Sequence, residues 1–124
     1  MSIVTIDQTE KFDKALEDAT KAGKLIIAKF GAKWCKPCKE VAPHYKEFAG
    51  KYQDMIFLDV DFDTDDNEDL ADDWKVKKLP MFIVIKEGKE HERLQHSDKD
   101  KLLALISKQF KEAAKSAFSM DEDF

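Results

Sequence analysis

Short apolar segments alternate along the chain with longer segments in which apolar residues recur every three or four positions. An apolar run of about four to eight residues is typical of a strand, and a spacing near 3.6 residues is typical of a helix. The pattern predicts strands at 3–6, 24–30, 55–60, 81–85 and 89–94. It predicts helices at 9–23, 35–52, within 61–73 and from 97 to about 110.

These elements follow one another in the order β-α-β-α-β-α-β-β-α, which predicts an α/β fold. Strands that alternate with helices favour a mixed, mostly parallel sheet with helices on both faces. Glu87 and Gly88 suit a tight turn between the last two strands. We therefore expect the final hairpin to add an antiparallel edge to the sheet.

Several predicted helix ends carry residues that suit them. Thr9 is expected to cap the first helix, and Ser97 with Asp100 resembles a capping box for the last one. Gly23 is expected to end the first helix. Pro43 lies inside the second predicted helix, where it predicts a kink.

The chain has 124 residues, enough for one domain with a buried core but too few for two ordinary domains. No internal repeat or Pro/Gly/Ser-rich linker divides residues 1–110, which we expect to form that domain. Residues 111–124 continue a helical apolar pattern and then become acidic, which predicts a C-terminal helix extension and an acidic tail. A tail that docks on a partner is the alternative.

Composition and charge narrow the class of protein. Apolar residues make up 43% and charged residues 38%, as in globular domains. The formal net charge of −5 argues against nucleic-acid binding, which needs a basic surface. Residues 29–40 differ from the rest, because four lysines against one acid give them a local charge of +3. Charged side chains occupy the first 20 residues and no later run could span a bilayer, so we expect a cytoplasmic monomer without membrane contact.

The chain has only two cysteines, Cys35 and Cys38. Their short separation does not suit a structural disulfide framework, which bridges distant parts of a small secreted chain. A structural zinc ion needs about four ligands, and the other candidates are only His44, His91 and His96. The pair therefore predicts redox chemistry that needs no bound cofactor.

The predicted position of the pair, where a strand ends and a helix begins, suits thiol–disulfide exchange. Residues three apart on a helix lie on one face, close enough for a local disulfide. The helix N-terminus favours negative charge, so Cys35 is expected to ionise first and act as the nucleophile. Cys38, one turn inside, is expected to resolve the mixed disulfide. Pro37 fixes the turn between them, and three lysines add positive charge: Lys33, Lys36 and Lys39.

Residues 30–39, Phe-Gly-Ala-Lys-Trp-Cys-Lys-Pro-Cys-Lys, resemble the active-site segment of the thioredoxin family, and Ala-Pro at 42–43 resembles its kinked helix. Leu-Pro-Met-Phe at 79–82, followed by Lys-Glu-Gly at 86–88, resembles the cis-proline loop and last hairpin of that family. The resemblance covers about residues 3–110. It implies the thioredoxin fold, reduction of disulfide-containing client proteins, and a thioredoxin reductase as a partner.

The resemblance also assigns expected roles around the cysteines. It implies that Pro80 is cis and lies against them, and that the backbone of Leu79 pairs with an incoming peptide. Trp34 either stacks over the disulfide and shapes the partner groove or covers the rim of the site. We expect Trp74 to belong to the core.

Three positions depart from the family pattern. Lys36 stands where the family usually has glycine, Gly31 where it has one of its tryptophans, and Lys29 where it has a buried acid. Some members pair that acid with a lysine on the next strand, at the place of Asp59. We therefore hypothesise a charge-reversed buried pair of Lys29 and Asp59, which a separation beyond about 4–6 Å would exclude. The alternative is that Lys29 extends its ammonium group to water.

Either arrangement places a cation beneath the sulfurs, which would favour thiolate and make the couple more oxidising. Two other functions stay open from the sequence. One is a non-enzymatic thioredoxin-like adaptor or subunit of a larger assembly. The other is a glutathione-dependent oxidoreductase, which Lys36 and the pattern before Pro80 disfavour.

Overall fold

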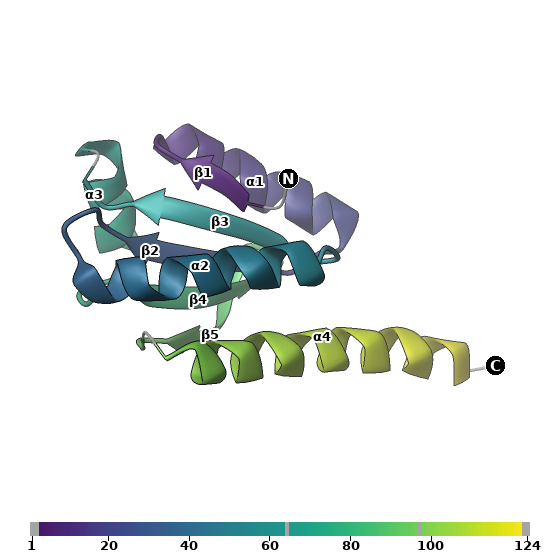
Figure 1. The fold of residues 1–124 in the computed structure, drawn as a ribbon. Coiled ribbons are helices and arrows are strands. Elements are labelled where there is room, and N and C mark those ends of the chain that lie inside the picture. Colours follow the sequence, from purple (N-terminus) through teal and green to yellow (C-terminus); the bar gives the residue numbers. More distant parts are fainter. Residues whose placement is uncertain (1–2, 64, 97, 123–124) are drawn as a thin grey trace.

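A five-stranded sheet in the order β1-β3-β2-β4-β5 forms the centre of the molecule (Figure 1). This computed structural model describes residues 3–63, 65–96 and 98–122, with side chains described for 3–63, 67–96 and 98–111. The strands are β1 (Ile3–Ile6), β2 (Ile26–Gly31), β3 (Ile56–Asp61), β4 (Met81–Lys86) and β5 (Lys89–Leu94). The helices are α1 (Thr9–Ala22), α2 (Lys36–Lys51), α3 (Asp65–Asp73) and α4 (Lys99–Glu122). The predicted order of elements is confirmed.

Four of the five strands run in one direction, because β3 is parallel to both β1 and β2 whereas β4 is antiparallel to both β2 and β5. The mixed, mostly parallel sheet and its antiparallel last hairpin were predicted. The antiparallel pairing of β2 with β4 was not. Helix α3 has nine residues, about 14 Å, and stands at the end where β3 finishes (Figure 1), so the chain re-enters the sheet from the end at which it left.

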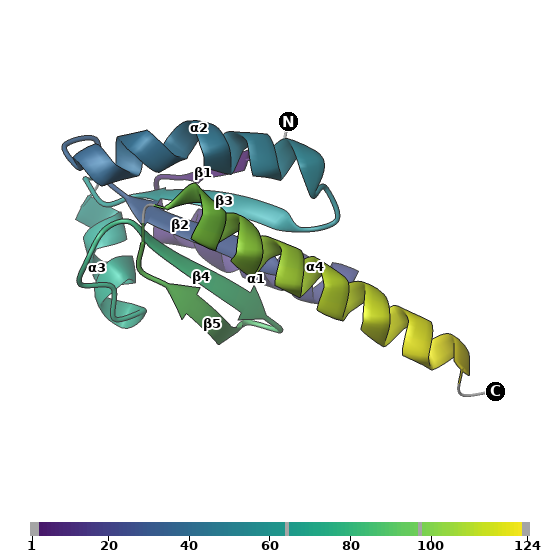
Figure 2. The same cartoon turned by 60° about the horizontal axis from the view of Figure 1, so that its bottom comes forward.

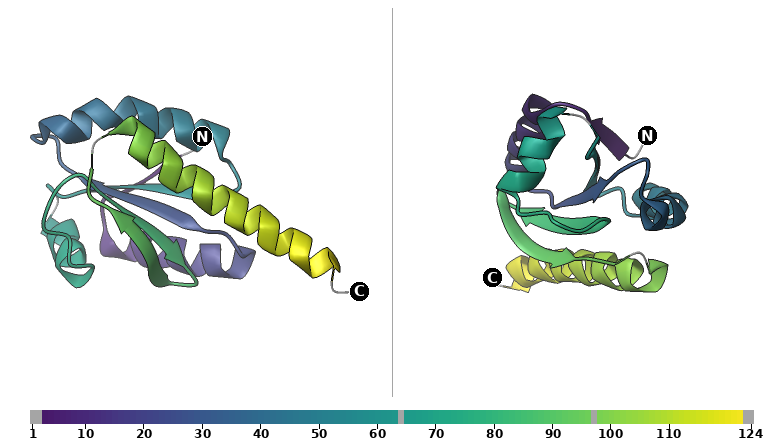
Figure 3. Two further views of the ribbon diagram at one scale, coloured as in Figure 1. Left: turned by 90° about the horizontal axis from the view of Figure 1, so that it is seen from below. Right: turned by 90° about the vertical axis from the view of Figure 1, so that its left-hand side faces the viewer.

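Helices cover both faces of the sheet, with α1 and α3 on one and α2 and α4 on the other (Figure 3). Strand β2 is buried on both faces, which explains its nearly continuous apolar run. Its residues alternate, so that Ile26, Ala28 and Phe30 join the first core. Ile27 joins the second core, and Lys29 therefore points to the α2 side.

The helix ends agree with the sequence in part. Gly23 ends α1 in the left-handed conformation, with φ of 69°. The cap of α1 is Gln8 and not Thr9, because Gln8 has extended backbone and its carbonyl accepts the N–H groups of Lys11 and Phe12. The prediction for Thr9 was wrong by one residue. Ser97 lies outside the described residues, so the capping box stays a prediction.

Helix α4 is longer than the sheet it covers (Figure 2). Its 24 residues span about 36 Å, against about 20 Å for a six-residue strand. The core residues Leu102, Leu105 and Ile106 all lie in its first turns. The partner-docking tail concerns side chains outside the described ones and is not tested. None of the helices in the described part of the chain combines the length and apolar composition needed to cross a membrane.

Candidate redox-active site

Cys35 and Cys38 form a disulfide at the N-terminus of α2, with Cα atoms 5.3 Å apart. Cys35 is the N-cap, and the Cys38 backbone N–H donates to its Sγ at 3.3 Å. Pro37 is in the first turn, where a missing N–H leaves no helical bond unmade. The Cys35 sulfur therefore lies where free amides and the helix dipole favour negative charge.

The two cysteines are buried but border different spaces. Cys35 is 6% exposed and lines a groove of about 430 Å³ together with Trp34, Phe62 and Leu79. Cys38 is 3% exposed and lines a second cavity of about 290 Å³. A visiting disulfide in the groove would therefore meet Cys35.

The loop before β4 completes the groove. The peptide bond between Leu79 and Pro80 is cis, as the family resemblance implied. Leu79 packs against the small apolar cluster of Ala32, Cys35 and Cys38. Since β4 is the antiparallel neighbour of β2, its start and the end of β2 lie side by side at the same end of the sheet.

Trp34 is 67% exposed and is held by Asp63. The Asp63 carboxylate accepts the Trp34 indole N–H at 2.7 Å and the Lys33 backbone N–H at 3.1 Å. Trp34 thus forms a fixed wall of the groove beside Cys35. Asp63 was not among the site residues predicted from the sequence. The signal was available, because β2 and β3 are parallel neighbours and the segments that follow them lie at the same end of the sheet.

Lys29 and Asp59 lie directly opposite each other on β2 and β3. The Lys29 Nζ and Asp59 Oδ1 atoms are 3.9 Å apart, so the hypothesised contact exists. The side chain of Lys29 is 8% exposed and that of Asp59 is 41% exposed. Only the lysine is buried, which corrects the expectation of a fully buried pair. Lys29 Nζ also lies 5.8 Å from the centre of the Tyr45 ring, a favourable place for a cation.

The second cavity places this pair beside the inner sulfur. Its lining includes Lys29, Gly31, Cys38 and Asp59. A Cβ on Gly31 would lie 3.4 Å from Cys38 Sγ and 3.5 Å from Lys29 Cε, so those two atoms are at most about 7 Å apart. The glycine leaves open a space that a large side chain would occupy. The buried cation and the inner sulfur therefore share one compartment.

Tyr45 anchors α2 to the sheet beneath the site. Its hydroxyl lies 2.8 Å from the Ile27 carbonyl oxygen and 2.7 Å from that of Leu58, and it donates its single proton to one of them at a time. Burial raises the pKa of Tyr45 well above its usual value, and the nearby Asp59 carboxylate adds to the shift. The phenol is therefore neutral and serves as a hydrogen-bond donor.

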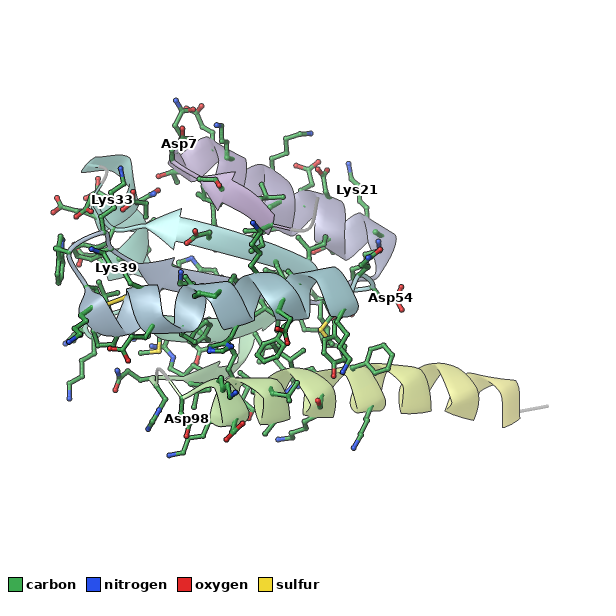
Figure 4. All side chains as sticks on the ribbon, viewed as in Figure 1. Asp7, Lys21, Lys33, Lys39, Asp54 and Asp98 are labelled. Atoms are coloured by element: carbon green, nitrogen blue, oxygen red, sulfur yellow. A yellow bond between two sulfur atoms is a disulfide. The ribbon has the colours of Figure 1, made fainter. Side chains whose placement is uncertain are left out.

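The lysines predicted around the cysteines are exposed. Figure 4 shows Lys33 and Lys39 at the end of the molecule where α2 begins, which is also where the disulfide lies. Both line the second cavity, and Lys36 is exposed at the first helical position. Within the described part of the chain, no three or more His, Cys, Asp or Glu side chains are grouped to hold a metal ion.

The thioredoxin family model matches residues 3–108 of the chain. The chain belongs to the thioredoxin family. A thioredoxin H-type protein of Fagopyrum esculentum is 35% identical over 105 residues, which cover 85% of this chain and 89% of the relative. Thioredoxin H1 of Arabidopsis thaliana is 32% identical over 106 residues, covering 86% of this chain and 91% of that protein.

Solved thioredoxin structures share the fold. The crystal structure of a poplar thioredoxin h matches with a TM-score of 0.84 and 31% identity, covering 89% of this chain and 97% of that one. Thioredoxin f2 in a complex with ferredoxin:thioredoxin reductase matches with a TM-score of 0.79 and 30% identity, covering 87% and 94%. With the Cys35–Cys38 disulfide, this likeness shows a thiol–disulfide oxidoreductase. The function of the thioredoxin relatives thus favours the enzyme over the adaptor.

Proposed function

We propose that this thioredoxin reduces protein disulfides, with Cys35 as the nucleophile and Cys38 as the resolving residue. The Cys35 thiolate attacks one sulfur of the client disulfide, and the other client sulfur leaves and takes up a proton. Cys38 then loses its proton and attacks Cys35 Sγ, which re-forms the Cys35–Cys38 bond and releases the first client sulfur as a thiol. The client gains two electrons and two protons, and the thioredoxin ends as the disulfide.

The placement of the two sulfurs supports Cys35 as the first residue to attack and Cys38 as the second. Cys35 lines the groove of about 430 Å³ and sits at the helix N-terminus, whereas Cys38 lines the cavity behind it. A client that rests in the groove therefore meets Cys35, whereas Cys38 faces the other space. Trp34, Lys36, Pro37, Leu79 and Pro80 shape the surface on which the client rests.

Lys29 and Asp59 tune the second step in this proposal. The Lys29 ammonium shares a cavity with Cys38 and would favour its thiolate, the form that must attack. Asp59, 3.9 Å from the ammonium, limits that effect by its opposite charge. Because a stabilised thiolate stabilises the reduced protein, the pair would make the couple more oxidising than thioredoxin at about −270 mV.

We further propose that a thioredoxin-reductase-type protein returns the disulfide to the dithiol, so that the chain carries electrons to its clients as a monomer. The related thioredoxin f2 was solved in a complex with ferredoxin:thioredoxin reductase, which supports a partner of this kind. A reducing compartment such as the cytoplasm fits this cycle, since both cysteines of the chain belong to the exchange pair and the fold depends on no other disulfide.

Insulin reduction driven by dithiothreitol tests the proposed cycle. Cys35→Ser should abolish catalysis above the uncatalysed rate, because no nucleophile faces the groove. Pre-reduced Cys38→Ser, mixed with insulin after the dithiothreitol has been removed, should instead accumulate a mixed disulfide between Cys35 and the client, visible as a mass increase under non-reducing conditions. Activity that survives Cys35→Ser would contradict the assigned order, and a wild type inert toward insulin would leave the adaptor as the function.

A further inference from the structure

Two adjacent lysines stand on the wall of the client groove. Lys77 and Lys78 line it together with Cys35 and directly precede the cis peptide of Leu79 and Pro80. Both side chains are exposed. Among the described residues that line this groove, Lys77 and Lys78 are the ones that carry charge. The groove therefore offers a client two cations close to the attacking sulfur.

A second set of lysines, from a distant part of the sequence, stands at the same end of the molecule. Lys36 directly follows Cys35 and is exposed, and Lys33 and Lys39 flank the cysteines on the same end of the molecule (Figure 4). The chain as a whole has a net charge of −5. Folding thus gathers lysines from residues 33–39 and 77–78 around the disulfide of an acidic protein.

Three acids near the site, Asp59, Asp61 and Asp63, are engaged in contacts of their own. Both carboxylate oxygens of Asp63 accept hydrogen bonds, from the Trp34 indole and the Lys33 amide. Asp61 accepts the Asp63 backbone N–H at 2.9 Å, and Asp59 lies against Lys29. These contacts hold the three carboxylates in the loop and the second cavity, whereas Lys77 and Lys78 line the groove.

We propose that the groove selects clients whose disulfide is flanked by acidic residues. This inference rests on the proposed function, because it names the substrate class of the same site. Exposed charges act chiefly on encounter, and complementary potentials raise association rates by roughly 10- to 1,000-fold at low salt. Carboxylates within a Debye length of about 8–10 Å of the lysines would be drawn toward Cys35.

Two synthetic peptides test this specificity. Each contains the same disulfide, flanked by two glutamates in one peptide and by two lysines in the other. The readout is the ratio of kcat/KM for the acidic peptide to kcat/KM for the basic peptide. For the wild type we expect a ratio of about 10 at an ionic strength of ~20 mM, falling to about 2 at ~0.5 M as salt screens the charges.

Lys77→Gln/Lys78→Gln should lower the ratio at low salt to about 3 or less, because Gln keeps much of the side-chain bulk but removes the charge. Lys86→Gln/Lys89→Gln is the matched control. Those two lysines pair with each other where β4 ends and β5 begins, and β4 separates them from the groove by about 20 Å. The control should lower the ratio far less, since its two charges lie about 20 Å from the groove, where the Coulomb attraction on a bound client is several-fold weaker than at the groove itself, even at ~20 mM.

The reduction potential separates recognition of the client from an effect on the cysteines. The potential of Lys77→Gln/Lys78→Gln should stay at the wild-type value while the ratio falls. Equal rates for both peptides, an equal loss of preference in the control, or a potential that moves with the ratio overturns the inference. Fast reduction of both peptides at equal rates would leave disulfide reduction standing, whereas failure to reduce either peptide would remove both proposals.

Discussion

Replacing the buried cation at Lys29 by an apolar side chain of similar length tests the proposed tuning of the redox pair. Lys29→Met removes the ammonium from the cavity that it shares with Cys38 and leaves the strand and its packing in place. Since the cation stabilises thiolate, and thiolate belongs to the reduced protein, the variant should be the more reducing of the two.

The geometry sets the order of magnitude of the effect. Lys29 Cε and Cys38 Sγ are at most about 7 Å apart. Two unit charges at about 7 Å interact by roughly 2.4 kcal/mol at an effective dielectric constant near 20. The Asp59 carboxylate, 3.9 Å from Lys29 Nζ, offsets much of this, which leaves about 1 kcal/mol. For a two-electron couple that free energy corresponds to a shift of about 20 mV toward more negative potential.

The shift should depend on pH, because the cation acts only on the ionised form of Cys38. Equilibration with glutathione or dithiothreitol buffers between about pH 6 and 9.5 measures it, and the difference from wild type should grow with pH toward about 20 mV. Lys24→Met, at the exposed position before β2, is the control and should match the wild type throughout. A difference that is independent of pH, or a more oxidising Lys29→Met, would refute the reasoning.

Three further predictions concern contacts around the site. Asp63→Ala frees the Trp34 indole, which should cost about 1 kcal/mol in urea unfolding and change Trp34 fluorescence in a Trp74→Phe background; unchanged fluorescence would contradict the contact. The pKa of Tyr45 is raised in the fold, so the stability that its neutral phenol contributes is fully present below the unfolded-state pKa of 10.0 and should be lost as pH rises above it. Tyr45→Phe should lower the free energy of unfolding by about 1 kcal/mol at pH 7. The melting temperature of this variant should fall less than that of the wild type at alkaline pH. Truncation after Lys111 should change the free energy of unfolding by less than about 0.5 kcal/mol, because the core residues of α4 precede it; a loss above about 2 kcal/mol in urea would show that the projecting helix belongs to the domain.

Local patterns in the sequence were sufficient to predict the strands and helices of this fold and their order. The apolar run of β2 and the helical spacing of Val41, Tyr45 and Phe48 reflect burial, and burial determines both periodicities. The direction of β4 was not readable from such patterns. The direction depends on the end of the sheet at which α3 ends and β4 begins. That is a property of the connection between β3 and β4 and not of the strand itself.

The residues of the site likewise fall into those that local motifs predicted and one that they did not. The spacing of Cys35 and Cys38 and the cis peptide before Pro80 followed from local motifs and the family resemblance. The contact of Lys29 with Asp59 was also anticipated, because adjacent strands place equivalent positions side by side. Asp63 was missed, since its partners lie 29 and 30 positions away and it belongs to an acidic stretch in which no single residue stands out.

The cysteine helix and the proline loop are attached to β2 and β4, which are neighbours inside the sheet and not at its edges. Their ladder pairs Phe30 with Met81, next to both halves of the site. Separating the two halves would break backbone hydrogen bonds in the most deeply buried part of the molecule. Amide hydrogens of this ladder should therefore exchange only through global unfolding, so that the spacing between disulfide and loop persists for as long as the protein stays folded.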